Sequence, residues 1–366
     1  EAMGFDQMSG MGGGNIADMM GAMDHGHFET MGSGNVADMA MAMDFGHFEA
    51  MGADKTFEMV EAMGFDQMSG MGGGNIADMM GAMDHGHFET MGADRTFEMA
   101  EAMGFDQMSG MGGGNIADMM GAMDHGHFET MGGSQMVDFV DVMNMENFQS
   151  MGADKTFEML DTMGLDTLMD MGSTKIADIA GGLDKDAFQS IGSEQVLEMA
   201  AVMEPENLAS LGGSAAAGMI ETLNGEQLST LGSDHLAGLA GSLDANTASS
   251  LGAERASSMV SNMDVGGISS VGASVMEGMM AGIPDDKVTD LGIDQQGAVL
   301  DTIGADFLGS QGSGFGDIAV AETTFDQISA AVEPGVTEAL ATIDFFSGVD
   351  LFSEATTVPN DAGSTG

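Results

Sequence analysis

The sequence predicts an all-α protein, an α-solenoid of about seventeen 20-residue two-helix repeats stacked into a rod or superhelix. Three observations predict this fold class. An apolar residue recurs every 20 residues from Met3 to Ile303 without an insertion, and a glycine follows nine residues after each one. Apolar residues within a unit lie three residues apart instead of alternating, which excludes strands. Residues 1–32, 61–92 and 101–132 are identical, as expected of copied units.

Each unit predicts two short helices. Numbered from its first apolar residue, a unit is apolar at positions 1, 6, 9, 14, 17 and 18, which in the second unit are Met23, Phe28, Met31, Val36, Met39 and Ala40. The pairs 6 and 9 and 14 and 17 each share one helix face, so we expect helices at positions 3–9 and 12–20. Glycine at position 10 is typical of a left-handed helix stop. Asp24, Asp44 and Asp184 at position 2 are expected N-caps, and Pro205 and Pro284 fall where helices should begin.

The repeats divide the chain into regions. Tandem helical hairpins are expected over residues 1–342, with near-identical Met-rich copies at 1–182 and diverged Leu/Ile-rich copies at 183–342. Residues 343–352 resemble a closing half-repeat cap, and 353–366 read as a disordered polar tail. Glu1-Ala2 precedes Met3 as Glu61-Ala62 precedes Met63, so we expect the chain to be a piece of a longer array.

The amino-acid composition excludes several classes of partner and of chemistry. The chain has 59 acidic and seven basic residues and a net charge of −52, which disfavours nucleic acid and anionic membranes and leaves cations, basic proteins and mineral surfaces as partners. No apolar run is long enough to insert into a membrane. Cysteine is absent, which excludes thiolate chemistry. The MGGGN stretches lack the lysine of a phosphate loop and are interpreted as turns between helices. No nucleophile–base arrangement appears, and we do not expect an enzyme.

The 43 methionines allow two interpretations. Thioethers bind Cu(I), which would suit a copper-handling protein. Forty of them, however, fall on the six apolar positions, where leucine and isoleucine replace them in later units, and the exceptions are Met41, Met145 and Met169. Methionine is therefore interpreted as a core residue. A secondary hypothesis is that such a core tolerates or scavenges oxidants.

Histidine is the stronger metal candidate. The segment MDHGHFETMG, at 23–32, 83–92 and 123–132, resembles the Met/Asp/His-rich stretches of periplasmic copper-resistance proteins. That resemblance implies copper ligation by Asp24, His25 and His27, assisted by Met23 or Met31. The full set of candidate metal ligands is Asp24, His25, His27, His47, Asp84, His85, His87, Asp124, His125 and His127. The alternative is a polar helix start that faces water. The copies lie two or three units apart, about 20–30 Å, and so cannot share one ion.

A row of carboxylates is expected along one side. Position 16 is acidic in ten consecutive units, namely Asp18, Asp38, Glu58, Asp78, Glu98, Asp118, Asp138, Glu158, Asp178 and Glu198. Neighbours about 10 Å apart repel by roughly 0.4 kcal/mol in water, which salt or divalent ions relieve. Carboxylate oxygens suit Ca²⁺. The alternative is a solvated face that gathers cations diffusely.

We therefore predict a non-enzymatic structural or interaction protein, an acidic spacer, stalk or scaffold that is extracellular or at the cell surface, with a cytoplasmic scaffold as the other location. The runner-up function is a metal-handling protein that binds copper through the Met/His/Asp segments or Ca²⁺ through the carboxylate row. A third is capture of a protein or peptide on the concave face. An unpaired apolar face at Met3 is expected either to promote end-to-end self-association or to mark the place where a longer array was cut.

Overall fold

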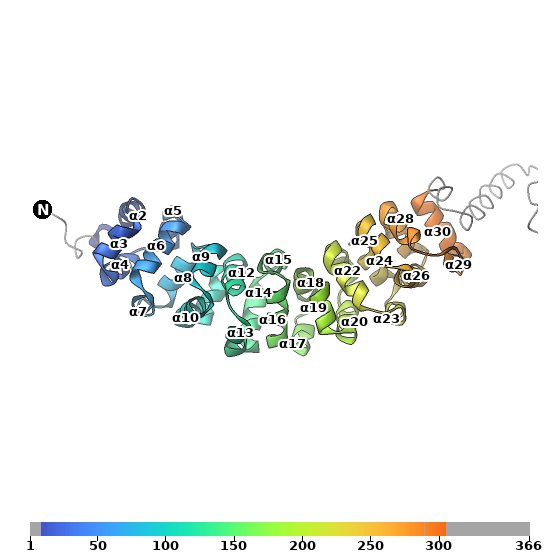
Figure 1. Cartoon of the computed structure of the whole chain (residues 1–366), viewed down its shortest axis with the longest axis horizontal. Coiled ribbons are helices and arrows are strands. Elements are labelled where there is room, and N and C mark those ends of the chain that lie inside the picture. Colours follow the sequence, from blue (N-terminus) through green and yellow to red (C-terminus); the bar gives the residue numbers. More distant parts are fainter. Residues whose placement is uncertain (1–8, 289, 305–366) are drawn as a thin grey trace, which may run out of the picture.

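A computed structural model describes residues 9–288 and 290–304, and this part of the chain is helical throughout, with no strand. The all-α prediction is confirmed. The helices follow one another in chain order along an elongated body (Figure 1). The last units of the predicted array beyond Gly304, the cap at 343–352 and the tail at 353–366 lie outside the described residues.

Longer and shorter helices alternate along the chain. The longer ones carry even numbers and are α2 (Gly13–Gly21), α4 (Ser33–Ala40), α6 (Ala53–Met63), α8 (Gly73–Gly81), α10 (Ala93–Met103), α12 (Gly113–Ala122), α14 (Gly133–Val142), α16 (Ala153–Met163), α18 (Ser173–Gly182), α20 (Ser193–Val202), α22 (Gly213–Thr222), α24 (Ser233–Gly241), α26 (Ala253–Asn262), α28 (Ala273–Ala281) and α30 (Ile293–Ile303).

The shorter helices carry odd numbers and include the predicted positions 3–9. They are α3 (His25–Met31), α5 (Phe45–Met51), α7 (Phe65–Met68), α9 (His85–Met91), α11 (Phe105–Met108), α13 (His125–Met131), α15 (Met145–Met151), α17 (Leu165–Asp170), α19 (Lys185–Ile191), α21 (Pro205–Ala209), α23 (Gly225–Thr230), α25 (Ala245–Ser250), α27 (Val265–Ser270) and α29 (Asp285–Val288), with 3₁₀ turns η1 (Ser9–Met11) and η2 (Ser109–Met111).

The glycine at position 10 separates the two helices of a unit, as predicted, but its conformation differs from the expected left-handed stop. Gly52 has φ 92° and ψ 156°, an extended conformation with positive φ that is almost restricted to glycine. The longer helix begins at the next residue, one position earlier than predicted. The MGGGN stretches are therefore not turns throughout, because Gly13 and Gly14 already belong to α2.

The predicted N-caps are confirmed. Asp24, Asp44 and Asp184 each accept a hydrogen bond from a backbone N–H three residues later. Pro205 is the first residue of α21, where its missing N–H costs no helical hydrogen bond. Gly64, Gly104 and Gly164 occupy position 2 in other units and adopt positive φ instead of providing a side-chain cap. Helices α6, α10 and α16 consequently run one residue further, up to these glycines.

The six predicted positions supply most of the core, and small residues at position 15, such as Ala117, add to it. In the units around the middle of the chain, Met123, Phe128 and Ile116 are fully buried, and the cluster they belong to extends along the whole described part. Of the methionines that the structure describes, only Met41 is largely exposed, at 43%, and the rest are buried or packed against the core. Met41 is one of the three that fall off the apolar positions. The interpretation of methionine as a core residue is confirmed.

Three units place threonine at core position 14. Thr56, Thr96 and Thr156 are completely buried polar residues at a position that is apolar in most other units. Their hydroxyls donate to carbonyl oxygens at the end of the preceding short helix, and in the last copy Thr156 Oγ1 lies 2.9 Å from Gly152 O and 3.2 Å from Phe148 O. Both carbonyls also accept backbone N–H groups, from Gly152 and Thr156, so the hydroxyl shares these acceptors and is not buried without a hydrogen bond.

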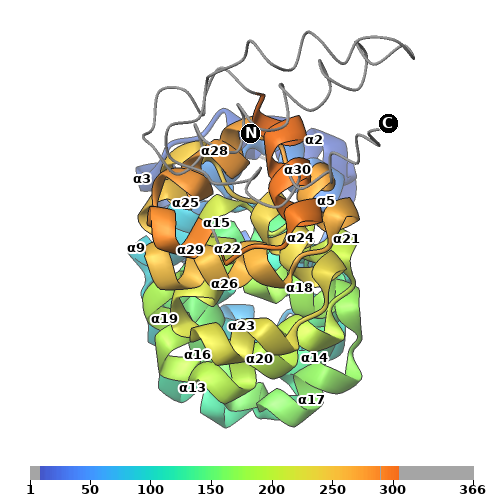
Figure 2. The ribbon, with the colours of Figure 1, turned by 90° about the vertical axis from the view of Figure 1, so that its right-hand side faces the viewer.

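Helix contacts connect each unit to the next one and to the next but one. The α12 helix, for example, packs against α9 from the preceding unit and against α15 from two units later. The same pattern recurs at α24, which packs against α21 and α27. Viewed along the long axis, helices from both ends of the chain overlie one another within one outline (Figure 2). Burial of the apolar faces therefore depends on two neighbours on each side.

Candidate functional site

The histidine-containing segments form the starts of short helices. In α3, the Asp24 carboxylate accepts from the His27 N–H at 3.1 Å, and the Asp24 N–H donates to His27 Nδ1 at 3.3 Å. The same reciprocal pair forms between Asp44 and His47 and between Asp84 and His87. This is a capping box with histidine in the place usually taken by glutamate or glutamine. The carboxylate and the imidazole therefore satisfy backbone groups that the helix leaves unpaired.

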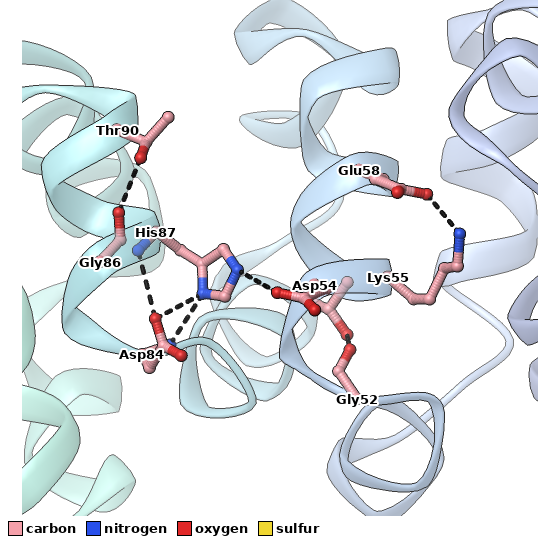
Figure 3. A network of polar contacts seen from close by, with 9 residues as sticks. Gly52, Asp54, Lys55, Glu58, Asp84, Gly86, His87 and Thr90 are labelled. Carbon is pink, nitrogen blue, oxygen red and sulfur yellow. Dashed lines mark hydrogen bonds and ion pairs between the residues drawn. The ribbon is translucent and has the colours of Figure 1, made fainter.

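His87 also connects two units. Its Nε2 lies 3.1 Å from the Oδ1 atom of Asp54, which stands near the start of α6, 33 residues earlier in the chain (Figure 3). On the other side of the ring, His87 Nδ1 lies 2.6 Å from Asp84 Oδ1, so a carboxylate faces each ring nitrogen. The ring also packs on Phe57, with centroids 5.0 Å apart. Only 12% of the His87 side chain is exposed. This side chain therefore links α9 to α6, two units away.

The link is repeated at His127 and is missing at the other two histidines of this position. His127 Nε2 lies 3.3 Å from Asp94 Oδ1, and its ring stacks on Phe97 at 4.6 Å. The residue 33 positions before His47 is Gly14, which offers no carboxylate, and 32% of the His47 side chain is exposed. The sequence has no residue 33 positions before His27, and 65% of the His27 side chain is exposed. The sequence contained this pattern, since aspartate and phenylalanine at positions 12 and 15 precede the histidine by two units.

The other histidine of each segment makes different contacts. His25, His85 and His125 at position 3 approach a glutamate one turn later, with Nε2–Oε1 separations of 3.5, 3.4 and 3.6 Å. His85 Nδ1 additionally lies 3.1 Å from the backbone oxygen of Asp118 in the next unit. At His25 and His125 the Nδ1 atom is buried without a hydrogen-bond partner. The two histidines of a segment thus contact separate partners.

Within residues 9–288 and 290–304, no three His, Asp or Glu side chains lie close enough together to hold one metal ion. At His87, the carboxylates of Asp84 and Asp54 lie at opposite nitrogens of the ring. A single metal ion therefore cannot bind the ring and both carboxylates at once. Each segment forms a polar helix start, but the side chains of His87 and His127, at 12% and 16% exposure, do not face water. Copper or Ca²⁺ binding stays a prediction, and calorimetric titration of Cu(I), Cu(II) and Ca²⁺ tests it.

The position 16 carboxylates have different surroundings. Glu58, Glu158 and Asp178 each lie within ion-pair distance of a lysine three residues earlier, at 2.7, 3.0 and 3.7 Å. Asp78 and Asp118 are partly buried, and this burial raises the pKa of both carboxyl groups. The nearby charges Asp44 and Asp84 raise the pKa of Asp78 and Asp118 further, whereas His85 lowers that of Asp118. Asp44 and Asp84 are at position 2 of the unit that precedes Asp78 and Asp118, respectively. Whether the ten side chains act together on cations stays a prediction.

Replacing Asp118 with asparagine is expected to stabilise the protein at neutral pH. Burial raises the pKa of Asp118 in the folded chain, so folding is opposed once the group ionises. This loss of folding free energy is complete at pH values above the pKa of the folded state, and it disappears at pH values below the pKa of the unfolded state, which is about 3.9. Asp118→Asn should therefore raise the unfolding free energy by about 0.5 kcal/mol at pH 7, the upper end for surface changes, and leave it unchanged near pH 3. Thermal melts across pH measure this, with the exposed Asp138→Asn as the control for the same repeat position.

Comparison with known proteins found no match among family models, curated proteins or solved structures. A separate search of the described helices found none that combines the length and the apolar character needed to cross a bilayer. The function of this chain is therefore inferred from the packing of its helices.

Proposed function

We propose that this protein is an acidic α-solenoid that acts as a spacer, stalk or scaffold, with its reach set by the number of units. The observation that carries this proposal is the contact pattern, in which helices pack against the next two units and the same core positions recur from α2 to α30. In such an array stability is approximately a sum of unit and neighbour terms, so copies can be added or lost without refolding the rest.

Polar contacts at position 13 support a stiff array. Lys175 Nζ donates to Met143 O at 2.7 Å, Arg255 Nε donates to Leu223 O at 3.0 Å, and Gln295 Nε2 donates to Met263 O at 2.7 Å. Each acceptor lies 32 residues earlier, where a longer helix has just ended. The donor satisfies a carbonyl that the helix end leaves open. Long side chains at this position thus reach position 1 of the preceding unit, where the longer helix of the unit before that one ends, a link that the sequence analysis did not anticipate.

Deleting residues 61–100 is expected to shorten the protein and leave it folded. The deletion joins residue 60 to residue 101, and because residues 101–132 are identical to the removed residues 61–92, α6 continues into the same sequence. Two units should be lost from the long axis, about 16–20 Å if each adds one interhelical spacing. Small-angle X-ray scattering measures the maximum dimension, and circular dichroism measures the helix content per residue.

The matched control removes residues 61–90, which joins position 18 of one unit to position 9 of another. This deletion breaks the period and should lower the helix content per residue and the melting temperature. The spacer proposal is wrong if the in-register deletion leaves the maximum dimension unchanged, or if it unfolds the protein as the out-of-register deletion does.

A further inference from the structure

Two surface grooves recur at the same repeat positions, one hundred residues apart. The α6 groove is formed by Phe57, Val60, Glu61, Met91 and Arg95 with their neighbours, and the α16 groove by Phe157, Leu160, Asp161, Ile191 and Gln195 with theirs. Each groove has an aromatic ring from position 15, an aliphatic residue from position 18 and a carboxylate from position 19 of one unit. The remaining walls come from the next unit and from the unit two places later. The recurrence shows that the repeat itself builds the groove.

Glycine at position 2 keeps each groove open. Gly64 and Gly164 line the two grooves and adopt φ of 72° and 84°, where other units have an aspartate N-cap. A Cβ atom built on either glycine would meet nothing within 4 Å. The unit that carries the glycine therefore leaves open space between the end of the longer helix and the unit beyond it.

The size of the grooves fits one large side chain. Their volumes are about 180 and 190 Å³. An engineered apolar cavity of about 150 Å³ in another protein binds benzene. Each groove can thus take an aromatic or leucine-sized side chain against its aromatic and aliphatic walls, but it is too small for a folded element.

Charge identifies the occupant. Both grooves carry an exposed carboxylate at the rim, Glu61 or Asp161, in a chain with 59 acidic residues against seven basic ones. The grooves differ at position 13, where the α6 groove has Arg95 and the α16 groove has the neutral Gln195. A cationic segment is therefore attracted to both grooves and more strongly to the α16 groove.

We propose that the α6 and α16 grooves bind basic peptide segments of a partner protein, each taking one aromatic or large aliphatic side chain whose flanking lysine or arginine pairs with Glu61 or Asp161. This interaction goes beyond the spacer role and does not depend on it. A spacer with such grooves would hold its partner at fixed places along the array.

The chain has no tryptophan or tyrosine, so tryptophan fluorescence of an added peptide reports binding without background. The probe is the acetylated, amidated peptide Lys-Trp-Lys, titrated with the full chain at moderate salt. A saturable blue shift is expected. The peptide Glu-Trp-Glu should bind at least about tenfold more weakly, since like charges oppose it. The proposal is overturned if both peptides bind equally or if neither binds.

Four variants locate the binding. Arg95→Gln should strengthen binding and Asp161→Asn should weaken it, each by about two- to fivefold at these exposed positions. Thr90→Phe together with Ser190→Phe fills both grooves from the rim and should remove at least half of the bound signal. Ser150→Phe should change nothing, because Ser150 has the same repeat position but the unit two places before it has Ala117 and Gly121 in place of the aromatic residue and the carboxylate. Diffuse adsorption to the acidic surface, which would leave binding unchanged in the filled variant, overturns the proposal. Circular dichroism confirms that each variant is folded, and the two charge variants test the proposal independently of the filled one.

Discussion

Phe148→Ala is expected to lower the free energy of unfolding by about 3–5 kcal/mol, the usual cost of removing a buried phenylalanine. Phe148 is completely buried at position 6 of its unit. Phe148 on α15 packs directly against Gly182 on α18. A Cβ atom added to Gly182 would lie only 2.5 Å from the Cβ atom of Phe148. Truncation leaves a cavity that the rigid helix pair cannot close. Urea denaturation followed by far-ultraviolet circular dichroism measures the loss.

The matched control is Phe45→Ala, because Phe45 is 40% exposed at position 3 and should cost no more than about 1 kcal/mol. Hydrogen exchange adds a second readout. In an array whose contacts are local, the loss of protection should centre on α15 and α18 and fade within a few units. Equal costs for the two substitutions, or loss of protection spread evenly along the chain, would contradict the proposed packing.

Gly73→Ala should destabilise the protein by about 3 kcal/mol, the upper part of the range for overpacking. A Cβ on Gly73 would lie 1.9 Å from the backbone oxygen of Met103. No change of rotamer moves a backbone carbonyl, so α8 must move away from the end of α10. At Gly113, in another MGGGN stretch, the space is also closed, because a Cβ there would lie 2.4 Å from Asn147 Oδ1 and 2.6 Å from Val142 O. Thermal and urea unfolding measure the effect.

The adjacent Gly74→Ala is the control. A Cβ there meets nothing within 4 Å, and Gly74 lies in the exposed first turn of α8. Alanine is the better helix former by about 0.5–1 kcal/mol, so this substitution should stabilise the protein. Neighbouring glycines are thus expected to give opposite signs. If both substitutions stabilise, the close approach of α8 to α10 is wrong.

The local structure could be predicted from the sequence because its causes are local. Spacings of three between Phe28 and Met31 and between Val36 and Met39 place each pair on one helix face, and the structure buries or packs all four residues. Asp24 at position 2 was expected to cap a helix and does so. Each prediction depended on residues within a few positions of one another, where the chain geometry alone fixes which groups can meet.

The candidate site was harder to predict because its contacts depend on residues that are distant in the sequence. The sequence placed His25 and His27 beside Asp24, and a shared ion was one reading of that proximity. A helix start turns the two rings toward different partners, His27 toward the Asp24 backbone and His25 toward Glu29. The partner that distinguishes His87 from His47 is Asp54, 33 residues away, and no local rule connects those positions.

By itself, the sequence determined the all-α class, the pair of helices in each unit and the residues of the core. The tertiary structure decided which units touch, why Thr56 can occupy a core position, why Gly73 has no side chain and where the two grooves open. A 20-residue period fixes what each unit buries, but it leaves open the rotation from one unit to the next. That rotation brings unit n against unit n+2, and it depends on packing between side chains that are more than 30 residues apart in the chain.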